Sequence, residues 1–273
     1  MLNILYLSKK FKIRKMKKIA TLILLLIGTQ LITKAQTAEE IISTYLTNIG
    51  GEEALKNLKN TKMIAKVEAQ GMTIPLEVIN MADGRMIVKF QLQGVEMVQQ
   101  AFDGETSWGI NFMTQKPEKN EAEDTENIKR EAGDFPDPFL NYKEKGYTIE
   151  LMGKETIEGT ECYKIKLTKK PLLADGQEVE NVHYYYFDTE NYVPIVSETE
   201  IKSGEMKGSI SQTVYSDYTE VNGIYFPFSI NSRIKDGPGQ PVTVEKMEMN
   251  TDIDESIFKF PETTEGASTE TTK

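Results

Sequence analysis

The sequence predicts a mainly β protein in which about a dozen antiparallel strands curl into a barrel or half-barrel. After Asn60, apolar and polar residues alternate with a period of two, as they do in strands that bury one face. Tight-turn sequences such as Asp83-Gly84 and Asp103-Gly104 separate these runs, and no repeat of fixed length is present.

Before the strands, residues 1–35 have the features of a secretory signal peptide. Lys17 and Lys18 precede a leucine-rich run, which ends at Thr33-Lys34-Ala35 with small residues at both cleavage-site positions. A membrane-spanning helix is the alternative, but it needs about 20 uninterrupted apolar residues. We therefore expect export to the periplasm and cleavage after Ala35, with either Met1 or Met16 as the start.

The expected mature domain, residues 36–260, opens with a helix. Thr37 and Glu40 have the spacing of a capping box, in which each side chain bonds to the other residue's backbone amide. Gly50-Gly51 is expected to end this helix, and a short helix over residues 52–58 follows. The apolar residues of the first helix fall on one face: Ile41, Ile42, Tyr45, Leu46 and Ile49.

Twelve strands are expected in two groups, separated by a polar segment. Residues 114–132 are rich in Glu, Lys and Asn, and we expect a loop that runs into a helix over 125–132. Residues 169–179 are expected to be a long link, and residues 261–273 a disordered tail. The expected strands are four between 61 and 102, then 106–112, 147–154, 161–168, 180–187, 193–201, 207–218, 224–234 and 242–249.

Charge and cysteine content narrow the classes of partner. The formal net charge of the chain is −10, and the predicted leader holds only basic charged residues, so the mature domain is more acidic still. Such a surface repels nucleic acid, and we expect no nucleic-acid partner. Cys162 is the single cysteine, so neither an internal disulfide nor a lipid anchor at the cleavage site is expected.

Catalytic and metal-binding chemistry is poorly represented. His183 is the single histidine and heads a tyrosine-rich strand, and no nucleophile elbow accompanies it. One histidine and one cysteine exclude the usual zinc ligand sets, and Asp252 with Asp254 is expected to cap a helix rather than bind calcium. The sequence therefore favours a non-enzymatic protein without metal or cofactor.

Several segments together resemble the outer-membrane lipoprotein-sorting proteins, the LolA/LolB-like family, in the form common in Bacteroidota. The likeness spans nearly the whole mature chain and consists of turns and strand ends rather than chemical motifs. The segments are Ala38 to Ile42, Asn48 to Gly51, Ala101 to Gly104 with Trp108, Tyr142 to Gly146, Gly153 to Glu155, Glu158-Gly159, Tyr185 to Asp188, Tyr215 to Tyr218 and Gly223 to Pro227.

This resemblance implies an unclosed antiparallel barrel whose concave face is covered by the N-terminal helix and the mid-chain helical insertion. It also implies a monomeric periplasmic carrier of lipoprotein acyl chains or another hydrophobic ligand, with an inner-membrane exporter and an outer-membrane acceptor as partners. Arg85 matches the strand arginine that bonds to the helical lid in such carriers, although its flanking residues depart from the carrier motif.

The residues expected to line the cavity come from strands and from the first helix. Phe90, Leu92, Met97 and Trp108 are the candidate wall, and Ile41, Ile42, Tyr45 and Leu46 are the candidate helix contacts. The alternative function is an interaction or sensor module whose half-barrel is filled by its own side chains. Methionines in the strands suit an adaptable wall, but they also fill gaps in ordinary cores.

Overall fold

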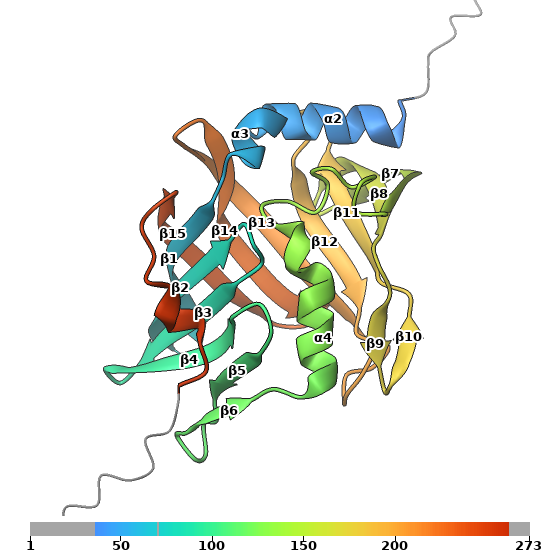
Figure 1. Cartoon of the computed structure of the whole chain (residues 1–273). Coiled ribbons are helices and arrows are strands. Elements are labelled where there is room, and N and C mark those ends of the chain that lie inside the picture. Colours follow the sequence, from blue (N-terminus) through green and yellow to red (C-terminus); the bar gives the residue numbers. More distant parts are fainter. Residues whose placement is uncertain (1–35, 70, 262–273) are drawn as a thin grey trace, which may run out of the picture. The chain divides into compact units, whose positions relative to one another are not determined.

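One thirteen-stranded antiparallel sheet is the framework of the computed structural model, which describes residues 36–69 and 71–261 (Figure 1). The predicted leader and the tail from residue 262 onward lie outside the described residues, so cleavage after Ala35 stays a prediction. The described residues from Thr37 to Pro261 group into one compact unit.

The strands are numbered in chain order. Those before the helical insertion are β1 (Asn60–Ala69), β2 (Met72–Met81), β3 (Met86–Leu92), β4 (Val95–Phe102), β5 (Ser107–Ile110) and β6 (Pro117–Lys119). After it come β7 (Thr148–Ile157), β8 (Thr160–Thr168), β9 (Leu172–Ala174), β10 (Gln177–Val179), β11 (Val182–Asp188), β12 (Pro194–Glu200), β13 (Ile210–Val221), β14 (Ile224–Ile234) and β15 (Gly239–Met249).

The order of the strands leaves the sheet unclosed. It runs β6-β5-β4-β3-β2-β1-β15-β14-β13-β12-β11-β8-β7, so the pairing of β1 with β15 joins two antiparallel meanders. The edge strands β6 and β7 do not pair with each other. The predicted fold, an antiparallel barrel that fails to close, is therefore confirmed.

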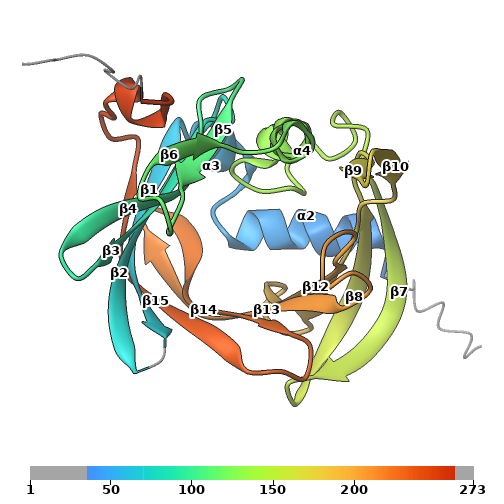
Figure 2. The same ribbon diagram turned by 90° about the horizontal axis from the view of Figure 1, so that it is seen from below.

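Helix α2 (Ala38–Asn48) lies across one end of the curved sheet (Figures 1 and 2). Thr37 Oγ1 accepts from the amide of Glu40, and the Glu40 carboxylate accepts from the amide of Thr37, which is the predicted capping box. Gly50 and Gly51 follow with positive φ, and the short helix α3 (Glu52–Lys56) leads into β1. The apolar face of α2 packs against β8 and β11 on the inner side of the sheet.

Helix α4 (Ala122–Glu131) and the 3-10 turn η1 (Ala132–Asp134) connect the two edge strands. Figure 2 shows α4 between β6 and the β9–β10 hairpin. Its side chains are at most half-buried, in agreement with the polar sequence of this segment. The helix predicted over residues 125–132 is thus present, beginning three residues earlier.

Two regions differ from the sequence-based expectation. β6 forms within the predicted loop, and β9–β10 form a hairpin within the predicted link. These three strands are short and lack an alternating apolar pattern, so no sequence signal marked them. The hairpin is held instead by α4: Asn127 donates to the carbonyl of Leu173 (2.8 Å) and accepts from its amide (2.7 Å).

The outer face of the sheet is covered in two places. The C-terminal turn η2 (Glu255–Phe258) packs Phe258 against Ile79, Ile87, Ala101 and Trp108. Asp254 caps this turn by accepting from the amide of Ser256 (2.9 Å), as the sequence predicted for the paired aspartates. Cys162, Tyr186 and Val196 form a smaller outer cluster.

Candidate ligand-binding site

A row of side chains can be followed around the inner face, because directly opposed residues in an antiparallel pair point to the same side. It starts at Ile165, which packs with α2, and passes through the opposed pairs Ile165–Tyr185 and Tyr185–Ser197. The Ser197 hydroxyl bonds to that of Tyr215 on the next strand, β13. Tyr215 opposes Ile230, and Ile230 opposes Val242. The inner face of the β1–β4 half is therefore the face on which α2 lies.

The part of this inner face that α2 leaves uncovered is apolar and half-exposed, and we call it the inner trough. Val78 lies opposite both Met63 and Val88, and Val242 lies opposite both Val67 and Ile230. Side chains of this kind in an ordinary core would be buried. The residues of the inner trough are Met63, Val67, Leu76, Val78, Met86, Val88, Phe90, Phe228, Ile230 and Val242.

The opposite face of the same strands is charged. Glu77 forms ion pairs with Lys62 (2.8 Å) and Lys89 (2.9 Å), and Lys66 pairs with Glu245. Outside the apolar cluster that η2 covers, which includes Ile79 and Ile87, the outer surface of these strands is charged, while the uncovered concave side is apolar. The asymmetry directs any apolar ligand to the inner trough.

The segment from Phe135 to Phe139 enters the concave side between α4 and α2 and divides the space there. Phe139 is buried against Tyr45, Tyr185 and Phe187 with edge-to-face ring contacts. Pro136 lines a cavity on each side of the segment. The half-barrel is thus filled at the end near α2 and keeps free volume beyond it.

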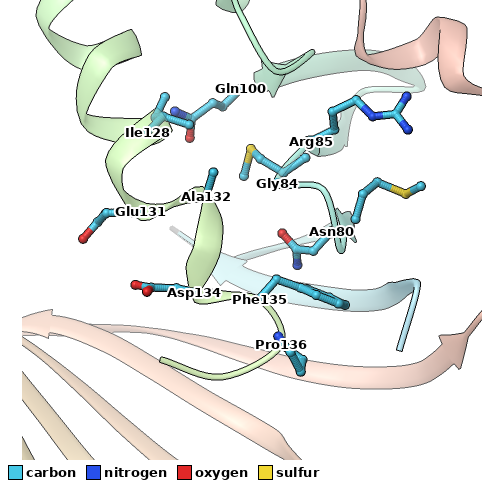
Figure 3. A pocket seen from close by; sticks show the side chains of 12 residues that line it. Asn80, Gly84, Arg85, Gln100, Ile128, Glu131, Ala132, Asp134, Phe135 and Pro136 are labelled. Atoms are coloured by element: carbon cyan, nitrogen blue, oxygen red, sulfur yellow. The ribbon is translucent and has the colours of Figure 1, made fainter. Parts of the chain in front are cut away.

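The larger cavity, of about 360 Å³, lies between α4 and the β2–β3 turn (Figure 3). Ile128 of α4, Ala132 of η1 and Phe135 face it from one side, and Asn80 and Gln100 face it from the sheet. Its volume is within the range of about 300–1,000 Å³ that is common for small-molecule sites. Its lining mixes apolar groups with a few polar ones.

The second cavity, of about 210 Å³, lies beneath α2 and is walled by aromatic and proline side chains; we call it the tyrosine cavity. Its residues are Tyr45, Ile49, Leu55, Pro136, Asp137, Pro138, Tyr185, Pro194, Tyr215, Tyr218, Ile224, Tyr225, Phe226 and Pro227. The Tyr45 hydroxyl donates to the Asp137 carboxylate (2.5 Å), which ties α2 to the dividing segment. Burial raises the pKa of Asp137 above its ordinary value, although the Tyr45 hydrogen bond opposes this rise.

A polar cluster fastens the end of α4 to the sheet. The Lys169 ammonium, whose side chain is only 7% exposed, pairs with Glu131 and with Asp134 (2.8 Å). Asn181 donates to Glu131 (3.1 Å) and bonds to His183 (2.8 Å). Burial alone would raise the pKa of Glu131, but Lys169 and Asn181 outweigh it and hold the pKa below its ordinary value.

His183 and Cys162 are placed unfavourably for catalysis. Burial, with Lys169 nearby, lowers the pKa of His183 to about 4, so the ring is neutral at physiological pH. Burial raises the pKa of the Cys162 thiol to about 11, and this thiol lies on the outer face. Within residues 36–69 and 71–261, no group of three or more His, Cys, Asp and Glu side chains is arranged to bind a metal ion.

The helix residues expected at the site lie as follows. Ile41, Ile42 and Leu46 are buried between α2 and the sheet, and Tyr45 reaches the tyrosine cavity. They pack as core, and Tyr45 alone of the four lines a cavity described above.

The expected wall residues divide between the two faces. Phe90 belongs to the inner trough, with Met97 opposite it and Leu92 two residues farther along β3. Trp108 opposes Ala101 in the outer-face cluster around Phe258, where its Nε1 donates to the carbonyl of Phe258 (2.8 Å). The structure thus places Trp108 on the side away from the inner trough, because its strand register points it outward.

Arg85 also points away from the larger cavity (Figure 3). Its guanidinium pairs with Asp83 (2.7 Å) and Glu255 (3.0 Å) and lies over the ring of Phe258. The bond to a helical lid that the resemblance implied is replaced by a bond to the C-terminal turn. A buried cation that does bond to the helical insertion is Lys169, which sequence reasoning did not single out because its partners are distant in sequence.

The tyrosine cavity was also missed, although the sequence contained a signal for it. In Tyr184-Tyr185-Tyr186, the period of two places Tyr185 alone on the same face as His183 and Phe187. Tyr215 and Phe226 reach the same cavity from β13 and β14. Only the strand order brings these three positions together.

Comparison with known proteins supports the fold. A family model described as an uncharacterized protein matches residues 140–261, and no curated protein sequence matches the chain. A DUF1329 family protein from Desulfovibrio piger has a similar structure, with a TM-score of 0.53 and 10% identity over 82% of this chain and 98% of its own.

Two further solved structures are similar. One is the LolA superfamily protein NE2245 from Nitrosomonas europaea, with a TM-score of 0.50 and 15% identity over 82% of this chain and 98% of its own. The other is an outer membrane lipoprotein-sorting protein domain from Vibrio parahaemolyticus, with a TM-score of 0.50 and 11% identity over 80% of this chain and 94% of its own. At these identities the resemblance to the lipoprotein-sorting proteins is shown at the level of the fold. Separately, none of the helices in the described part of the chain has the length and hydropathy needed to cross a membrane.

Proposed function

We propose that this protein, which has the fold of the LolA superfamily, is a periplasmic carrier that shelters acyl chains of lipoproteins or a similar lipidic ligand without catalysis. The observation that carries the proposal is the inner trough, a half-exposed apolar surface that continues into two cavities. A soluble protein rarely leaves such a continuous apolar surface accessible unless something binds there.

The energetics suit this role. Exposing an acyl chain to water costs about 0.8 kcal/mol per methylene, so a chain of roughly sixteen carbons costs on the order of 10 kcal/mol. Met63 and Met86 lie in the inner trough, and their flexible side chains can adapt to chains of different shape. The acidic surface favours a freely diffusing protein, and we propose that the carrier is a monomer that receives its ligand from an inner-membrane exporter and passes it to an outer-membrane acceptor.

One observation favours the second candidate, a sensor or interaction module. Helix α2 and the segment from Phe135 to Phe139 already fill the end of the half-barrel with a packed core that includes Ile41, Ile42 and Phe187. If the rest of the inner face closes in solution, no space for a transported ligand remains. Native mass spectrometry of protein purified from the periplasm separates the two: co-purified lipid supports the carrier, and a bare polypeptide mass supports the module.

Two neighbouring residues of β15 provide a matched pair of variants for this test. Val242 points into the inner trough, and Thr243 points to the outer face beside Lys66. We expect Val242→Glu to lower lipid retention at least about tenfold, because a carboxylate against an acyl chain is strongly unfavourable. Thr243→Glu should retain lipid like the unmodified protein, and equal retention by both variants would contradict the proposed site.

A further inference from the structure

Tyr185 lines the tyrosine cavity, and its hydroxyl forms no hydrogen bond with another described residue. Its ring is fixed by Phe139, at a centroid distance of 4.9 Å, and by Phe187, at 6.3 Å. Burial raises the pKa of Tyr185 well above its ordinary value, so the hydroxyl keeps its proton and acts as a donor. Because this hydroxyl is open to the cavity rather than sealed in the core, it can donate to a ligand group or to water there.

The other deep hydroxyls of this cavity are satisfied. Tyr45 donates to Asp137 (2.5 Å), Tyr215 bonds to Ser197 (2.9 Å), and Tyr218 donates to the carbonyl of Pro194 (2.6 Å). Three neighbours thus have fixed partners, and Tyr185 stands apart from them. The acceptors of the wall, the Asp137 carboxylate and the Pro194 carbonyl, bond to Tyr45 and Tyr218, so the proton of Tyr185 is available to a ligand acceptor.

The tyrosine cavity adjoins the inner trough. Tyr215, in its wall, lies directly opposite Ile230 of the inner trough. Phe226, also in its wall, is followed along β14 by Phe228 and Ile230, which point to the same side with the period of two. An extended ligand in the inner trough therefore reaches the tyrosine cavity along one strand.

The charges at the cavity select the polar group that fits. Asp137 lines it, and no Lys or Arg side chain belongs to the lining formed by the described residues. The Lys145 ammonium donates to the backbone carbonyl of Asp137 (3.0 Å) but is not part of the lining. A free carboxylate would therefore meet the Asp137 carboxyl with no cation in the cavity wall, which is unfavourable for both groups. An uncharged carbonyl accepts from Tyr185 at no such cost.

We propose that the tyrosine cavity is the binding site for the uncharged ester or amide carbonyl of an acylated ligand, with Tyr185 as the donor. This inference rests on the proposed function, since the acyl chain itself occupies the inner trough. It makes the protein selective for esterified or amide-linked acyl groups over free fatty acids and plain alkanes. The selectivity comes from one neutral hydrogen bond and from the lack of a Lys or Arg side chain in the described lining.

The test compares three probes of equal chain length: methyl hexadecanoate, hexadecanoate and an alkane. Displacement of a fluorescent alkyl probe from the full mature chain gives their affinities. We expect the methyl ester to bind about fivefold to tenfold more tightly than the alkane, as one neutral hydrogen bond allows. The free carboxylate should bind more weakly than the ester.

Two variants locate the effect. Tyr185→Phe should remove the preference for the ester and leave the affinity for the alkane unchanged. Tyr184→Phe is the matched control, because Tyr184 lies one position away on the outer face beneath Lys164, and it should keep the preference. An ester preference that survives Tyr185→Phe, or equal binding of ester and alkane by the unmodified protein, overturns the inference.

Two outcomes separate this inference from the proposed function. If no probe binds, the carrier proposal itself fails. If ester and alkane bind equally well, the carrier proposal stands and the role of Tyr185 fails. Thermal unfolding gives a second readout: Tyr185→Phe should be at least as stable as the unmodified chain, since a hydroxyl without a partner contributes nothing, and a clear loss of stability overturns the inference.

Discussion

The ammonium of Lys169 lies 2.8 Å from the carboxylate of Asp134 and joins the sheet to the segment that connects its two edges. Lys169 directly follows β8, and Asp134 ends η1. The same ammonium also pairs with Glu131 at the end of α4. This cation therefore ties the end of α4 and η1 to the side of the sheet that β8 forms.

Replacing Lys169 with Met should destabilise the protein by about 3 kcal/mol, because it leaves two carboxylates in a partly buried site without their cation. The estimate is at the low end for broken buried pairs, since Glu131 keeps 40% of its side-chain exposure. Urea unfolding followed by circular dichroism measures the change. Lys170→Met is the control, because Lys170 is exposed, and it should change the free energy of unfolding by less than about 0.5 kcal/mol. Similar losses in both variants would show that the ion pairs contribute little.

Stability should fall as the pH is lowered from about 6.5 to about 4 because of His183. The pKa of His183 is about 4 in the folded protein, whereas an unfolded histidine titrates near 6.5, so the unfolded chain binds the extra proton in this window. The groups that face its ring are Lys169, Glu131, Asp134 and Asn181. The expected loss is on the order of 2–3 kcal/mol.

His183→Gln removes this titration while keeping a side chain that can bond to Asn181. Because the chain has one histidine, the difference between the two pH profiles between pH 4.5 and 6.5 isolates it. Urea midpoints at a series of pH values measure that difference. Parallel profiles for the two proteins would mean that His183 has an ordinary pKa in the folded state.

The capping box of α2 should contribute to stability. Thr37→Ala removes the acceptor for the Glu40 amide and should cost about 1 kcal/mol. Thr44→Ala is the matched change within the same helix, where the exposed Thr44 hydroxyl bonds to the carbonyl of Glu40. Since alanine is the better helix former, this variant should be neutral or slightly stabilising. Thermal unfolding of both variants checks the prediction, which fails if Thr44→Ala costs as much as Thr37→Ala.

The thiol of Cys162 should resist alkylation in the folded protein. It is fully buried, and its pKa of about 11 leaves little thiolate at pH 8. Iodoacetamide labelling followed by mass spectrometry should show slow modification of the native chain and complete modification in urea. Rapid labelling without denaturant would show that the smaller outer cluster, formed by Cys162, Tyr186 and Val196, opens readily.

Much of the fold could be predicted, because the signals for it are local. The capping box at Thr37 and the apolar face of α2 are present as expected, and the period of two around Val78 and Val88 yields strands with one apolar face. The unclosed barrel came from the family resemblance. The short strands β6, β9 and β10 carried no such signal, since their pairing depends on neighbours rather than on their own composition.

The candidate site was less predictable, because a strand's periodicity does not say which face is concave. Phe90 and Trp108 were equivalent candidates in the sequence, yet Phe90 lies in the inner trough and Trp108 lies in the outer-face cluster around Phe258. Arg85 was the expected cation of a helical lid, and the structure gives it Asp83 and Glu255 instead. Each of these outcomes depends on contacts between residues far apart in the chain.

The sequence by itself determined the helices and the longer strands, the alternation of apolar and polar faces along those strands, and the lack of a recognisable catalytic motif, since these follow from residue types at short spacing. Tertiary structure alone decided that β6 and β7 stay apart, that Lys169 meets Asp134, and that Tyr185 faces a cavity. The physical reason is that strand order and curvature arise from the packing of the whole sheet, and they set which distant side chains share a space.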